Sequence, residues 1–169
     1  MKLLKSLFVL FVAVSLLSCS SDDDSNQYEF NNANLSGTYT VTMLNSTEIQ
    51  TTNVNGLDVI TEYTTVGDTF QLTIVFSASG SYVIDGEYRD SYIETVAGQV
   101  QDEGSEIVVI DNATGNYSTN NSTMTFVMDG EVFSVALFNA NELRITSEDI
   151  YVESGDEFVY TSEIRMVRQ

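Results

Sequence analysis

The residue with the clearest chemistry in this chain is Cys19, the only cysteine among 169 residues. It completes the sequence Leu16-Leu17-Ser18-Cys19, which has the form of a lipobox. In a lipobox the cysteine thiol carries diacylglycerol, and the amine freed by cleavage can take a further acyl chain. One acyl chain holds a protein only marginally at a membrane, whereas two or three hold it stably. We therefore predict lipid attachment at Cys19, with the membrane as a partner through the acyl chains.

The residues before Cys19 are arranged like a secretory leader. Lys2 and Lys5 form a basic start, and residues 7–17 are an apolar run interrupted only by Ser15. This run is too short to span a bilayer but has the length of a signal segment. We predict a lipoprotein signal peptide over residues 1–18 and a lipid anchor at the outer membrane or cell surface. An ordinary signal peptide followed by a chance cysteine is the alternative.

The residues that follow Cys19 are polar and acidic. Residues 20–27 have no apolar side chain and include Asp22-Asp23-Asp24. Such a segment cannot bury enough apolar surface to fold, so we predict a flexible tether over residues 19–33. The acidic run fits either a solvated spacer or a signal for export to the cell surface.

Several residue types that carry familiar chemistry are missing. The chain has no histidine, its only two lysines lie in the leader, and Cys19 is assigned to lipid. This composition excludes Ser-His-Asp and Cys-His nucleophile systems, zinc sites with histidine, disulfides and Schiff-base lysines. We predict that the protein is not an enzyme and uses no cofactor or metal. The net charge of −19 excludes nucleic acid as a partner, because phosphate binding needs clustered Lys or Arg.

The acidic side chains suggest two kinds of site. No segment has the spaced oxygens and turn glycine of a calcium loop, so clusters such as Asp85-Gly86-Glu87 are interpreted as turn and rim charges. A pair of carboxylates held at the right separation could cleave a glycosidic bond. With 25 acidic residues, chance pairs are certain, so this carboxylate-pair hydrolase is only a third hypothesis.

The secondary structure that must position these side chains is predicted to be β-strand along most of residues 34–169. Apolar and polar residues alternate around Tyr39, along residues 70–77 and along residues 123–128. Period-2 alternation of this kind predicts strands with one buried face. Turn signals separate the runs at about ten-residue spacing. They are Asn55-Gly56, Ser79-Gly80, Asp129-Gly130, Asn139-Ala140-Asn141 and Ser154-Gly155-Asp156.

These signals predict the fold class. We expect one all-β domain over residues 34–169, an antiparallel up-and-down meander of some ten strands closed into a barrel. A β-sandwich is the alternative. Residues 102–105 are predicted as a loop, and residues 112–122 as a loop with one short strand around Tyr117.

The order of the motifs resembles that of bacterial lipocalin-like domain lipoproteins, which join a lipobox and a short tether to a small β-barrel. The motifs are Leu35-Ser36-Gly37-Thr38-Tyr39, Phe76-Ser77-Ala78-Ser79-Gly80-Ser81-Tyr82, Gly115-Asn116-Tyr117-Ser118 and Phe138-Asn139-Ala140-Asn141-Glu142-Leu143. The resemblance covers about residues 35–167. It implies a lipocalin-like barrel and ligand binding, and it brings no catalytic residues.

Ten residues are predicted to point into the barrel, where they line a ligand cavity or fill the core. They are Tyr39, Val41, Phe70, Leu72, Ile74, Phe76, Tyr82, Phe126, Phe133 and Leu143.

The leading hypothesis for function is non-enzymatic binding of a small apolar ligand or a protein partner. The second is a surface glycan-binding β-sandwich that aids sugar capture. In that case exposed tyrosines would form the stacking platform. The candidates are Tyr63, Tyr88, Tyr92, Tyr151 and Tyr160.

Overall fold

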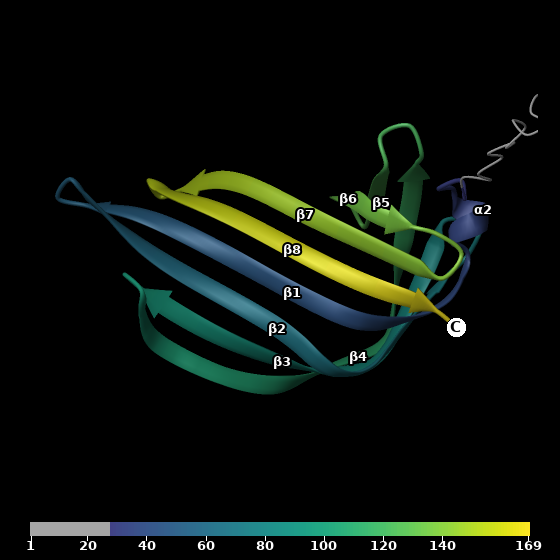
Figure 1. The fold of residues 1–169 in the computed structure, drawn as a ribbon, viewed down its shortest axis with the longest axis horizontal. Helices are drawn as coiled ribbons and strands as arrows, with labels where there is room; N and C mark the ends of the chain where they lie inside the picture. Colours follow the sequence, from purple (N-terminus) through teal and green to yellow (C-terminus); the bar gives the residue numbers. More distant parts are fainter. Residues whose placement is uncertain (1–27) are drawn as a thin grey trace, which may run out of the picture.

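The computed structural model describes residues 28–169, so the predicted signal peptide, Cys19 and most of the predicted tether lie outside the described residues. Eight antiparallel strands follow one another around a closed ring, with a short helix before the first (Figure 1). The elements are α2 (Asn32–Leu35), β1 (Gly37–Val54), β2 (Leu57–Phe76), β3 (Ser81–Val96), β4 (Gln99–Asn120), β5 (Thr125–Met128), β6 (Glu131–Phe138), β7 (Glu142–Glu153) and β8 (Asp156–Arg168).

The predicted antiparallel up-and-down meander, closed into a lipocalin-like barrel, is confirmed. Every strand pairs with its neighbour in sequence, and β1 closes the ring on β8. The sandwich alternative is wrong, because the described strands form one continuous ring. All five predicted turns connect strands. At Asn55-Gly56 both residues have positive φ, 53° and 85°, as a tight hairpin turn requires.

Three details of the prediction are corrected. There are eight strands, not ten, because the segments predicted as loops at residues 102–105 and 112–120 belong to the long strand β4. Polar side chains can occupy such a strand because much of β4 is exposed and has no face to bury. The turn at Ala97-Gly98 was missed, since alanine rarely adopts the positive φ of 48° that it has here.

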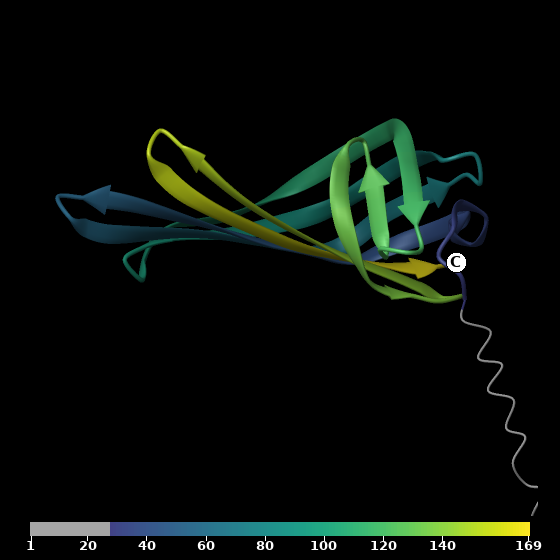
Figure 2. The same cartoon turned by 90° about the horizontal axis from the view of Figure 1, so that it is seen from above.

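The strands differ greatly in length, and this divides the molecule into two regions. β5 and β6 have 4 and 8 residues, whereas β1 to β4 have 16 to 22. β4 pairs with β5 only from Tyr117 onward, and β7 pairs with β6 only as far as Thr146. We call the part with all eight strands the closed end. The other six strands continue beyond it as an open sheet, here called the open half, toward the left of Figure 1 and of the view from above in Figure 2.

The hydrophobic core lies in the closed end. Phe76 is at its centre, with its ring edge-on to the rings of Tyr39, Tyr117 and Phe126 at centroid distances of 5.6, 5.0 and 5.8 Å. Edge-to-face aromatic pairs of this kind add to the stabilisation from burial alone. The fully buried side chains include Tyr39, Phe30, Phe126, Leu35, Leu143, Ile145, Met166 and Val41.

The segment before β1 belongs to the folded domain. Phe30 is 1% exposed, and the Asn31 side chain caps α2 by accepting a hydrogen bond from the Asn34 backbone N–H at 2.8 Å. Residues 28–33, which the sequence analysis assigned to the tether, are therefore part of the barrel's base. Two aromatic side chains, Tyr28 and Phe30, among mostly polar residues gave no periodic signal that could have placed this boundary.

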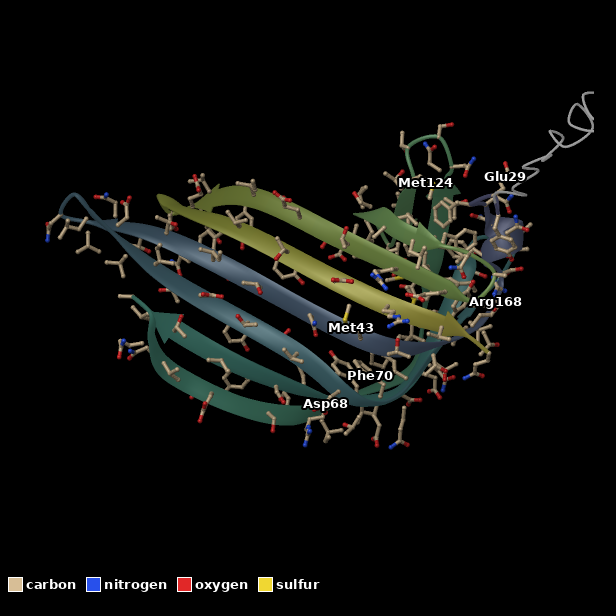
Figure 3. The ribbon with its side chains drawn as sticks, in the orientation of Figure 1. Glu29, Met43, Asp68, Phe70, Met124 and Arg168 are labelled. Atoms are coloured by element: carbon tan, nitrogen blue, oxygen red, sulfur yellow. The ribbon has the colours of Figure 1, made fainter. Side chains whose placement is uncertain are left out.

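Arg168, near the end of the chain, ties this segment to the barrel (Figure 3). Its guanidinium donates to the backbone oxygens of Ser36, at 2.6 Å, and Asn34, and to the Tyr39 hydroxyl. It also lies over the Tyr39 ring, 4.8 Å from the centroid. Burial raises the pKa of Tyr39 to about 12 and the nearby Arg168 opposes that rise, so Tyr39 is a neutral phenol at the base of the barrel.

Within residues 28–169, no helix combines the length and apolar character needed to cross a bilayer.

Candidate binding site on the inner face

A β-bulge in β1 decides which residues of this strand face inward in the open half. Tyr39 and Val41 point into the core, and the register of β1 against β8 then shifts between Val41 and Met43. One extra residue reverses the side-chain alternation. Leu44, Ser46 and Glu48 therefore continue the inner face beyond the core. Without the bulge, the alternation that points Tyr39 inward would have pointed them outward.

A pocket opens where the closed end meets the open half. Its volume is about 600 Å³, within the range of small-molecule sites. The apolar walls come from four strands, β1, β5, β6 and β8, and the acidic rim comes from β6 and β7. The lining includes Leu44, Met128, Val132, Phe133, Tyr160 and Ile164, with Glu131, Glu148 and Asp149 at the rim. We call it the mouth pocket.

Beyond the mouth, the inner face changes from apolar to hydroxyl-bearing. Residues paired across the strands form one row, in which the Ser147 and Ser162 hydroxyls lie 2.7 Å apart and those of Ser46 and Thr65 lie 2.9 Å apart. Across β7, β8, β1, β2, β3 and β4 the row reads Ser147, Ser162, Ser46, Thr65, Tyr92, Gly104.

The next row outward on the inner face consists of acids and tyrosines. In the same strand order it reads Asp149, Tyr160, Glu48, Tyr63, Glu94, Asp102. We call it the acid–tyrosine row. Its members come from six strands and from residues far apart in the sequence, so only the register of the sheet brings them together.

Aromatic pairs flank this row. The rings of Tyr63 and Tyr92 stack at 5.6 Å, and those of Tyr151 and Phe158 stack at 4.9 Å with an interplanar angle of 4°. Phe70 and Tyr88 stack at 5.7 Å where the open half begins; Figure 3 labels Phe70 there, midway along the sheet. These pairs give the open half local packing without a core.

The electrostatics of the inner face are negative. Burial and the neighbouring carboxylates of Asp90, Glu106, Asp102 and Glu94 raise the pKa of Tyr63. Asp102 accepts a hydrogen bond from the Tyr92 hydroxyl at 3.2 Å, and this carboxylate is the main cause of a raised Tyr92 pKa. On the other side, Tyr151 donates to Glu48 at 3.4 Å.

Asp90 and Glu106 form an acidic pair on the inner face. They lie directly opposite each other on β3 and β4. Burial, followed by the charge of Glu106, raises the pKa of Asp90, and the Asp90 Oδ1 atom is buried without a hydrogen-bond partner. Glu94 and Asp102 form a second directly opposed acidic pair on this face.

The ten residues predicted to line the barrel lie on its inside, mostly in the packed core. Nine are buried, at 0–7% exposure, and Phe70 packs against the core while partly exposed. Of the ten, Phe133 alone also lines the mouth pocket. The other lining residues were missed. Leu44 faces inward only because of the bulge in β1, and Tyr160 and Ile164 reach the pocket only through the pairing of β8 with β1 and β7.

The five tyrosines proposed for glycan stacking all lie on the inner face of β2, β3, β7 and β8, as their pairing partners show. Tyr63 and Tyr92 stack on each other, Tyr88 on Phe70, and Tyr151 on Phe158. Each of these rings therefore has one face occupied by its partner. A flat platform for sugar rings needs faces turned to solvent, so the geometry disfavours that arrangement.

No group of three acidic side chains within residues 28–169 converges in a way that could hold a metal ion. The carboxylates are spread along the rows of the sheet instead.

Comparisons with known proteins give little beyond the fold. No protein-family model matches the sequence, and no curated protein matches it. Among solved structures, the chain is similar to the S-type phycobiliprotein lyase CPES from Guillardia theta. The identity is 14%, the match covers 82% of this chain and 90% of that chain, and the TM-score is 0.26.

This comparison corrects one prediction. The chain was predicted not to be an enzyme, and the neighbour bears the name of a lyase. The missing residue types excluded particular nucleophiles and bases, but they left carboxylate, hydroxyl and phenol groups, so they did not exclude catalysis. The neighbour's name applies to that protein and assigns no reaction to this chain.

Proposed function

We propose that this protein is an exported, lipid-anchored barrel that binds a small apolar ligand in the mouth pocket. The observation that carries the proposal is the contrast along one inner face. At the closed end this face is filled by the protein's own side chains, with Tyr39, Phe126 and Leu143 at 0% exposure. At the mouth it opens into about 600 Å³ lined by apolar walls.

The lining of the mouth pocket defines the ligand's chemistry. Leu44, Phe133 and Ile164 offer apolar contact on the core side, and the carboxylates of Glu131 and Asp149 stand at the rim. An apolar body would bury against the walls, gaining about 25 cal/mol per Å² removed from water. A hydroxyl or amine at its other end would donate hydrogen bonds to the rim carboxylates.

The anchor part of the proposal is supported by the order of the leader, Ser18 and Cys19 in the sequence. The folded domain begins by Phe30, so about ten residues separate the lipid from the barrel. At that distance the domain would stand beside the membrane at the outer membrane or cell surface.

Ligand binding is tested by native mass spectrometry of the mature protein purified from its own host. We expect a retained adduct of defined mass. Leu44 lines the pocket on the inner face and is outside the hydrophobic core, so Leu44→Trp places a large ring in the pocket. The variant should lose the adduct. Val109→Trp, at a 68% exposed position facing away from the inner face, is the matched control and should retain it.

A protein without any adduct, and without binding of the neutral apolar dye Nile red, would contradict the small-ligand proposal. Equal binding by Leu44→Trp and Val109→Trp would place the ligand elsewhere. The anchor is tested separately with Cys19→Ser, which should move the protein from the membrane to the soluble fraction. Continued membrane partitioning of that variant would contradict lipid attachment.

A further inference from the structure

The acid–tyrosine row carries negative charge that the described part of the chain does not neutralise. Four of its six members are carboxylates, on β7, β1, β3 and β4. Residues 28–169 hold four arginines and no lysine. Arg89 pairs with Asp68 at 2.6 Å on the outer face, Arg144 and Arg165 pair with Glu142 on the outer face, and Arg168 is at the base of the barrel. The open inner face thus presents no cation of its own.

Like charges also stand directly opposite each other on this face. Glu94 pairs with Asp102 across β3 and β4, and Asp90 pairs with Glu106 nearer the mouth. Directly opposed like charges destabilise a sheet. The buried Asp90 Oδ1 has no hydrogen-bond partner, so part of its interaction capacity is unused. A cation lying on these carboxylates would reduce the repulsion between the like charges and give the Asp90 Oδ1 a partner.

The aromatic pairs make the same face suitable for long basic side chains. Toward β4, Tyr63 lies in the row and stacks on Tyr92 beside it. Toward β7, Tyr151 and Phe158 stack on each other and border the row. Lys and Arg pack their methylene stems against apolar surface and keep the charged head near carboxylates. Tyr63 and Tyr151 are 39% and 37% exposed, so each offers part of its ring to a guanidinium.

The dimensions of the row indicate a ligand with several separated charges. Neighbouring strands lie about 4.8 Å apart, so six strands place the end carboxylates of the row roughly 24 Å apart. No three acids within the described residues converge on one point, which fits several cations in sequence better than one ion. An extended chain rises about 3.3 Å per residue, so about seven or eight residues span the row.

We propose that the open inner face docks a basic, extended segment of a partner protein, laid across the strands along the acid–tyrosine row. This site shares Asp149 and Tyr160 with the mouth pocket and extends away from it across β1, β2, β3 and β4, so it goes beyond the function proposed above. Its specificity comes from carboxylates spaced along the row and from the aromatic pairs that border it.

The test uses the mature protein and a fluorescently labelled octapeptide of alternating Arg and Ser, with anisotropy measured at physiological salt. One triple variant neutralises the row: Glu48→Gln, Glu94→Gln and Asp102→Asn. The matched variant neutralises three acids on the outer face of the same sheet: Glu62→Gln, Glu103→Gln and Glu157→Gln. Both change the net charge equally, so nonspecific attraction falls equally in the two.

We expect the row variant to bind the octapeptide about tenfold or more weakly, and the outer-face variant to change affinity by about twofold or less. Equal loss in both variants, or no binding by the unmodified protein, would overturn the proposal. Spermine binding as tightly as the octapeptide, through the same three acids, would overturn the polypeptide part. Thermal unfolding of both variants verifies their fold.

The mouth pocket and the acid–tyrosine row are tested with different variants, so one proposal can be contradicted while the other is supported. Leu44→Trp fills the mouth pocket on its core side and should leave octapeptide binding unchanged, because Leu44 is outside the acid–tyrosine row. Likewise, the row variant should retain the adduct or Nile red in the pocket, since none of its three positions lines the pocket.

Discussion

The closed end and the open half are built from the same strands, yet their inner faces have opposite character. In β2, Leu72, Ile74 and Phe76 point into a core and are at most 5% exposed. Farther out on the same face of the same strand, Tyr63 is 39% exposed among carboxylates. The difference follows from β5 and β6, which are too short to continue the ring.

This contrast separates stability from recognition. A closed ring can exclude water from its interior, so its inner residues contribute burial energy. A six-stranded open sheet leaves its inner face wet, so polar and charged side chains are tolerated there and remain free to contact a partner. The two regions should therefore respond differently to the same kind of substitution.

The largest expected effect is on the core aromatic residues. Phe126 is 0% exposed and contacts the rings of Phe76, Tyr117 and Phe133. Phe126→Ala should lower the free energy of unfolding by about 3–5 kcal/mol, because it leaves a cavity among packed rings. Urea denaturation of the mature protein measures this loss.

The matched variant in the open half is Phe158→Ala, which removes a half-buried ring stacked on Tyr151. It should cost only about 1–1.5 kcal/mol, the contribution of one aromatic pair. If the two variants lost equal stability, the open half would be contributing to the core, and the division into two regions would fail.

The next largest loss of stability is expected when the Arg168 hydrogen bonds at the base of the barrel are removed. Arg168→Met removes hydrogen bonds from the guanidinium to Ser36, Asn34 and Tyr39. We expect a loss of about 2–3 kcal/mol, since bonds from a charged donor to partly buried acceptors are replaced by none. Arg89→Met, which breaks an exposed pair with Asp68 on the outer face, should cost less than about 1 kcal/mol in the same denaturation assay.

The smallest effects are those of pH, and they should have opposite signs in the two regions. At the closed end, the Tyr82 hydroxyl and the Asn116 backbone N–H donate to Asp129, which lowers the pKa of this carboxyl. Ionised Asp129 therefore stabilises the fold above its ordinary pKa of about 4, and this stabilisation is lost as pH falls through its lower folded pKa. Asp129→Asn should be less stable than the unmodified protein at pH 7, with the difference vanishing in acid.

In the open half, burial and Glu106 raise the pKa of Asp90. Its ionised form is disfavoured in the fold, so its cost is present above the raised folded pKa and is relieved as pH falls toward about 4. Asp90→Asn should be more stable than the unmodified protein at pH 7, and the gain should disappear in acid. Thermal unfolding across pH 3 to 8 with both variants measures the two signs, and equal signs would contradict the assignment.

Much of the fold could be predicted because its signals are local. The Asn55-Gly56 and Asp129-Gly130 turns and the alternation around Phe76 each depend on a few neighbouring residues. The core members were identified for the same reason, since alternation marks the buried face of a strand. The Ala97-Gly98 turn was not predicted, because alanine is not a residue type that indicates the positive φ found at Ala97.

The candidate sites could not be predicted in the same way. Leu44 and Glu48 face inward because one extra residue in β1 reverses the alternation, and no residue type marks that bulge. Asp149 and Asp102 belong to one row only through the register of six strands. The five tyrosines named for glycan stacking do share one face, but the sequence did not show that four of them are stacked in aromatic pairs.

The sequence by itself determined the export leader that we predict, the acidity, the missing nucleophiles and the succession of hairpins, because these follow from composition and from contacts between near neighbours. Tertiary structure alone decided where the ring closes and where it opens. That depends on strand lengths, on bulges in β1, β2 and β4, and on long-range register. Together these place apolar side chains in a sealed core and leave carboxylates and tyrosines on an open face.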